Sequence, residues 1–101
     1  MLNYLTEAAA KSGSIEVVDI LLASGAEING HMSYYHGHTA LQAAAEGGHL
    51  AVVERLILAG ENINAQNMKN QTAIQLAEMH GHDKVAAALK RAGGRRIMEV
   101  N

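Results

Sequence analysis

The stretch TALQAAAEGGHLAVVERLILAGENINA, from Thr39 to Ala65, decides the fold because parts of it recur along the chain. Its portion AAAEGGHLAVVERLILAGENIN (residues 43–64) aligns with AAAKSGSIEVVDILLASGAEIN (residues 8–29) at an offset of 35 residues. A weaker copy follows at an offset of 33 residues, where TALQAAAEGGH becomes TAIQLAEMHGH. Similar units at a nearly constant spacing indicate a repeat protein of three units.

Each unit has the pattern of two helices joined by a turn. The first helices are predicted over residues 4–11, 40–46 and 73–80, and each is followed by a glycine suited to a left-handed turn: Gly13, Gly48 and Gly81. The second helices carry paired apolar residues at helical spacing, as in Val52-Val53. One such helix pair cannot bury its apolar face alone, whereas stacked copies can, so we expect an all-α solenoid.

Composition excludes several classes of function. The chain has 101 residues, a net charge of −2 and a pI near 6.3, which gives no general attraction to nucleic acid or to membranes. It has no cysteine, which removes disulfides and thiolate zinc sites. The N-terminus lacks the pattern of a secretory signal, and no apolar run approaches the ~20 residues that span a bilayer. We therefore expect an intracellular protein, cytoplasmic or nuclear, with no cofactor.

The unit from Thr39 to Ala65 resembles an ankyrin repeat. That family's pattern opens Thr-Pro-Leu-His, continues with paired alanines, Gly-His and a Val-Val-x-x-Leu-Leu helix, and closes with Gly-Ala-Asp-x-Asn-Ala. The resemblance covers about residues 4–94, and TALQAAAEGGH after Tyr-Tyr also resembles the ankyrin arrays of filamentous-fungal proteins. It implies one domain over residues 1–101: a capping repeat (1–30), a middle repeat (31–65), a second capping repeat (66–94) and a tail (95–101), with β-hairpin-like loops between repeats.

Departures from the ankyrin pattern carry their own expectations. Gln42 and Gln75 stand where histidine is usual, and we expect them to hydrogen-bond the neighbouring turns. Asn70 stands where the hairpin glycine is usual, and we expect it to adopt the left-handed conformation, which Asn tolerates. Lys90 and Arg91 take the places of Ile57 and Leu58, which predicts a solvent-facing end of the stack. His49 and His82 occupy the Gly-His position and are predicted to be structural.

The stretch GHMSYYHGHTALQ gathers histidine and tyrosine in a hairpin two residues longer than its counterpart before Thr72. In ankyrin proteins, hairpin tips and the exposed sides of first helices form the concave face that holds partners. Carried over by position, the resemblance predicts a protein-binding surface. Its candidate residues are His31, Tyr34, Tyr35, His36, His38, Glu46, Met68, Lys69, Gln71, Met79 and His80.

Three alternatives compete with protein binding at the long hairpin. Tyr34 or Tyr35 could simply pack over the neighbouring hairpin. His31, His36 and His38 could bind a metal or a small ligand, although proximity alone fixes no ligand geometry. A histidine near Glu46 or Glu78 is a conceivable acid–base pair, but a solenoid offers a groove and no water-excluding pocket, so we do not expect an enzyme. The second interpretation overall is a self-associating protein with such a site.

Overall fold

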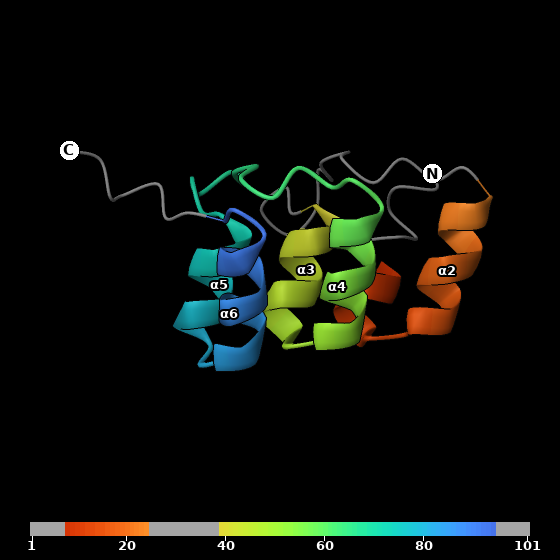
Figure 1. Ribbon diagram of the computed structural model, residues 1–101, viewed down its shortest axis with the longest axis horizontal. Coiled ribbons are helices and arrows are strands. Elements are labelled where there is room, and N and C mark those ends of the chain that lie inside the picture. Colours follow the sequence, from red (N-terminus) through yellow and green to blue (C-terminus); the bar gives the residue numbers. More distant parts are fainter. Residues whose placement is uncertain (1–7, 25–38, 95–101) are drawn as a thin grey trace.

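The computed structural model describes residues 8–24 and 39–94, which form stacked helix pairs. Residues 8–12 are helical and precede α2 (Ile15–Ala23). The next pair is α3 (Ala40–Gly47) with α4 (Leu50–Leu58), and the last is α5 (Ala73–Met79) with α6 (Asp83–Arg91). The pairs stand side by side along the long axis of the molecule, with the α3–α4 and α5–α6 turns on one side and the connection from α4 to α5 on the other (Figure 1). The predicted all-α solenoid is confirmed.

Predicted and observed helix ends agree within one residue in the second and third units. The first helices end at Gly47 and Met79, against the predicted residues 46 and 80. Gly13, Gly48 and Gly81 have the predicted left-handed backbone, with φ of 81°, 75° and 74°. The beginning of the first unit's helix, predicted from residue 4, lies outside the described residues before position 8.

Threonine and glutamine together start both well-defined first helices. The backbone N–H of Thr39 donates to Gln42 Oε1 at 2.8 Å, and the Gln42 N–H donates to the Thr39 hydroxyl at 3.2 Å. Thr72 and Gln75 form the same reciprocal capping box. Gln42 Nε2 also donates to the Ala65 carbonyl at 2.7 Å, so the predicted bond from Gln42 to a neighbouring turn is confirmed. Gln42 therefore caps its own helix and also holds the start of the next hairpin.

Small and aliphatic side chains fill the core. Ala43, Ala44 and Ala45 are almost fully buried on α3, where their size allows neighbouring helices to approach closely. The apolar pair Val52-Val53 on α4 is buried as predicted, at 1% and 0% exposure. Because burial of each such side chain contributes about 1.5–3 kcal/mol, the stacked faces supply most of the stability that one helix pair lacks.

A histidine in each later repeat locks onto the repeat before it. The ring Nε2–H of His49 donates to the Lys11 carbonyl at 2.8 Å, and His82 Nε2–H donates to the Glu46 carbonyl at 3.1 Å. The rings lie so close to the preceding turns that a Cβ on Gly13 or Gly48 would sit 2.5 or 2.6 Å from a ring nitrogen. The predicted structural role is confirmed, and each bond joins two successive repeats.

At the C-terminal end of the stack, only one of the two predicted charge substitutions distinguishes an end repeat from a middle repeat. Lys90 and Arg91 are both exposed, as expected of an outer end. Leu58, the counterpart of Arg91 in the middle repeat, is itself 83% exposed, so a charge at Arg91 does not mark an end. Lys90 does, because Ile57 at its position packs against the core. At the opposite side, α2 leaves Ile20 63% exposed.

Candidate partner-binding site

Six of the predicted binding residues lie in the described part of the chain. Met68, Lys69 and Gln71 belong to the connection before α5, Met79 and His80 lie at the end of α5, and Glu46 lies near the end of α3. We call these six residues the first-helix surface. The other five candidates lie outside the described residues: His31, Tyr34, Tyr35, His36 and His38.

Asn67 holds the turn that presents Met68 and Lys69. Its side-chain Oδ1 accepts the backbone N–H groups of Lys69 at 2.8 Å and Gln71 at 3.0 Å. Its own backbone N–H donates to the Gln71 carbonyl at 3.0 Å, and Asn70 takes the left-handed φ of 61° that the sequence predicted. Asn67 is 5% exposed whereas Met68 is 75% exposed. A buried amide therefore fixes the backbone while the Met68 side chain faces outward.

Gln71 connects this turn to α5. Its Oε1 accepts Asn67 Nδ2 at 2.9 Å, and its Nε2 donates to Met79 Sδ at 3.3 Å. Met79 is 64% exposed at the end of α5. One side chain thus ties the buried amide at the base of the turn to an exposed methionine on the first helix.

Glu46 and His80 join α3 to α5 across the repeat boundary. His80 Nε2 lies 3.6 Å from a Glu46 carboxylate oxygen, and their side chains are 44% and 28% exposed. The His80 ring stacks near the His82 ring, with centroids 6.3 Å apart and planes at 18°. His82 also binds Glu46, through the backbone carbonyl. Both histidines of the third repeat therefore contact Glu46 of the second, and the Glu46–His80 pair lies on a partly exposed surface between repeats.

Comparison with known families identifies the repeat unit. The family model for ankyrin repeats, in three copies, matches residues 5–99. The chain belongs to the ankyrin repeat family. Ankyrin repeats generally act as protein–protein interaction modules. No curated protein matches the chain at a significant level.

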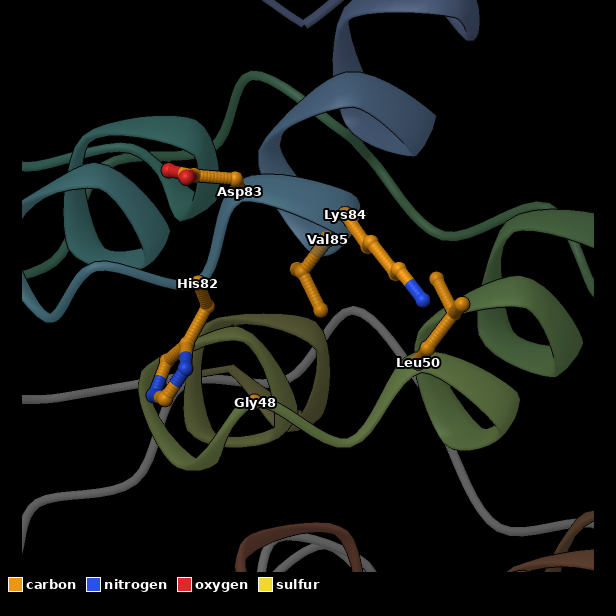
Figure 2. A pocket seen from close by; sticks show the side chains of 6 residues that line it. All are labelled: Gly48, Leu50, His82, Asp83, Lys84 and Val85. Carbon is orange, nitrogen blue, oxygen red and sulfur yellow. The ribbon is translucent and has the colours of Figure 1, made fainter.

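Apart from the first-helix surface, this ankyrin domain has an open pocket of about 240 Å³ beside the inter-helix turns. It lies between the α3–α4 turn, with Gly48 and Leu50, and the start of α6. Figure 2 shows Lys84 extending toward Leu50 and the Asp83 carboxylate turned away from Gly48. The pocket thus lies at the boundary between the second and third repeats, which the hydrogen bond from His82 to the Glu46 carbonyl also spans.

The described residues contain neither a cluster that could bind a metal nor a helix that could span a membrane. Within residues 8–24 and 39–94, no three histidine, aspartate or glutamate side chains are grouped so that they could hold a metal ion. None of the helices in those ranges is long and apolar enough to cross a membrane. The predicted metal alternative concerned His31, His36 and His38, which lie outside them.

Sequence reasoning missed two residues, Asn67 and Glu61. Asn67 precedes the hairpin tip, and an Asn followed by a left-handed position is a recognisable signal of a side-chain-supported turn. Glu61 stands where the ankyrin pattern quoted above has the alanine of Gly-Ala-Asp, yet it is only 4% exposed. The departure from a small residue was the available signal for Glu61.

Proposed function

We propose that this ankyrin domain binds another protein through the first-helix surface. The proposal is supported most directly by Met68 and Met79, two large apolar side chains that remain 75% and 64% exposed. Thioether side chains adapt to irregular apolar partners. Glu46, Lys69 and His80 belong to the same surface and would supply the polar margin that such an interface has around its apolar contacts.

Rigid presentation is the proposed mechanism. The Asn67 amide fixes the turn, the capping box fixes the start of α5, and Gln71 bonds to the Met79 sulfur. A surface whose backbone is ordered before binding loses little conformational entropy when a partner docks. Affinity then depends on the side chains that this ordered backbone exposes.

We infer that the longer first hairpin extends the same binding surface. Its tyrosines would supply contact area and a hydroxyl with few rotatable bonds. This part rests on sequence position within the ankyrin repeat, for Tyr34, Tyr35, His31, His36 and His38. Self-association remains the alternative, in which the partner is a second copy of the chain.

The test compares two double variants, each of which removes two large apolar side chains that are more than 60% exposed. The surface variant carries Met68→Ser and Met79→Ser. The control carries Ile20→Ser and Leu58→Ser, at 63% and 83% exposure, outside the surface. Circular dichroism first verifies that both double variants have the helicity of the wild type. Each tagged protein is then used to capture partners from lysate of the cells that produce it, and the bound proteins are quantified by mass spectrometry.

We expect a partner that the wild type and the control retain and that binds the surface variant at least about tenfold more weakly, a loss of about 1.4 kcal/mol in binding free energy. Equal retention by both double variants would reject the first-helix surface. Light scattering on the same three proteins identifies the alternative. A wild-type mass above the monomer that falls only in the surface variant would make the partner a second copy.

A further inference from the structure

Glu61 places a carboxyl group in a buried position three residues after the end of α4. The residue is 4% exposed, and neither carboxyl oxygen has a hydrogen-bond partner among the described residues. Its backbone is ordinary, since the Glu61 N–H donates to the Leu56 carbonyl at 3.2 Å. An unpartnered charge in such a place costs several kcal/mol, whereas the neutral acid costs far less.

The other repeats have a small residue at this position. Ala26 occupies it in the first unit and Gly94 in the third. Gly94 is buried as well, and its N–H donates to the Leu89 carbonyl as that of Glu61 does to Leu56. Ankyrin packing thus requires no carboxyl here, and the middle repeat alone carries one.

Among residues 8–24 and 39–94, the groups around Glu61 do not neutralise it. The Thr39 hydroxyl and the Leu41 backbone N–H, both at the start of α3, are neutral and only partly offset the burial. On α3 the charged side chain is Glu46, which lies beside His80. On α4 the charged side chains are Glu54, which is exposed, and Arg55, which is bound to Asp19 at 2.8 Å.

Burial therefore controls the protonation of this carboxyl. It raises the pKa of Glu61 from an ordinary 4.5 to about 8, while Thr39 and Leu41 act in the opposite direction. Loss of the proton would leave a buried charge between the end of α4 and the start of α3. Water or a rearranged backbone would then have to solvate it.

We propose that Glu61 is a proton-dependent latch: its side chain stays packed between the end of α4 and the start of α3 as the neutral acid, and the carboxylate does not. The folded protein holds this proton at pH values where the unfolded chain has released it. The unfolding equilibrium constant should therefore rise with pH, by up to about tenfold per pH unit between the two pKa values. The stabilising effect is complete at low pH and is lost as pH approaches 8.

Urea unfolding between pH 5 and 9 tests the latch, with Glu61→Gln as a neutral isostere and Glu54→Gln as the control. Glu54 is exposed on the same helix, so its variant should keep the wild-type pH dependence. The three proteins share every other ionisable residue, so the contributions of those residues cancel in the comparison. We expect the wild type and Glu54→Gln to weaken with pH relative to Glu61→Gln. Parallel curves for wild type and Glu61→Gln would overturn the proposal.

A direct titration covers the case in which Glu61→Gln does not fold. The side-chain carboxyl carbon of Glu61 can be followed by NMR in the ¹³C-labelled wild-type protein. A midpoint near 8 supports the latch, and a midpoint near the ordinary 4.5 contradicts it. Helicity recorded across the same titration shows whether ionisation loosens the fold at that midpoint.

Discussion

Replacing Gly48 by alanine should destabilise the domain far more than the same change at Gly81. Both glycines end a first helix with nearly the same left-handed backbone, φ 75° and 74°. Alanine in that conformation costs about 1–2 kcal/mol at either site. The two sites differ in the atoms next to the turn. A Cβ at Gly48 would sit 2.6 Å from His82 Nδ1, whereas a Cβ at Gly81 would have nothing within 4 Å.

The extra cost at Gly48 can be worked from the His82 contacts. Forcing the ring away from the turn is an overpacking effect of about 1–3 kcal/mol. It also breaks the 3.1 Å bond from His82 to the Glu46 carbonyl, a further loss of about 1 kcal/mol. We therefore expect Gly48→Ala to cost about 2–4 kcal/mol more than Gly81→Ala.

Urea titration followed by far-UV circular dichroism measures both free energies of unfolding, since the chain has no tryptophan for fluorescence. A double-mutant cycle then isolates the ring. In a His82→Ala background, Gly48→Ala should cost no more than Gly81→Ala does in the wild type. If the two single variants agree within about 0.5 kcal/mol, the histidine does not lock the repeats together, and this reasoning is wrong.

Further predictions concern a helix cap, an ion pair and a buried acid. Thr72→Ala removes the hydroxyl that caps α5 through Gln75 and should cost about 1 kcal/mol in the same titration; no loss would show that the cap is dispensable. Asp19→Asn should cost under about 1 kcal/mol, because Asp19 and its partner Arg55 are 38% and 48% exposed, and a larger loss would contradict that reasoning. Glu61→Gln should remove a pH dependence of at most about 1.4 kcal/mol per pH unit, because the contribution of Glu61 to stability is complete below pH 4.5 and falls up to about pH 8; an unchanged pH dependence would contradict this.

The fold could be predicted from the sequence because the repeat shows which residues are equivalent. Aligned glycines gave the turns, and aligned apolar pairs such as Val52-Val53 gave the buried faces. Asn70 was recognisable since few side chains tolerate a positive φ. Each of these signals depends on local backbone chemistry or on periodicity, which the sequence displays directly.

The details of the site were harder to predict because they depend on contacts between distant residues. The sequence could place His82 in a turn but could not show that its ring reaches the carbonyl of Glu46, 36 positions earlier. Position within the repeat predicts that Gln71 belongs to the surface, whereas its bond to the Met79 sulfur depends on how the turn meets α5. Glu61 showed only a local departure from a small residue, and its burial follows from the way α3 and α4 pack.

The most direct test of the proposed binding surface is photo-crosslinking in the cells that produce the protein. A photoreactive amino acid is placed at Met68, at Met79 or, as a control, at Leu58, all of them exposed side chains. We predict adducts with another polypeptide from positions 68 and 79 at much higher yield than from position 58. Equal yields from all three positions, or adducts from position 58 alone, would contradict a partner docked on the first-helix surface.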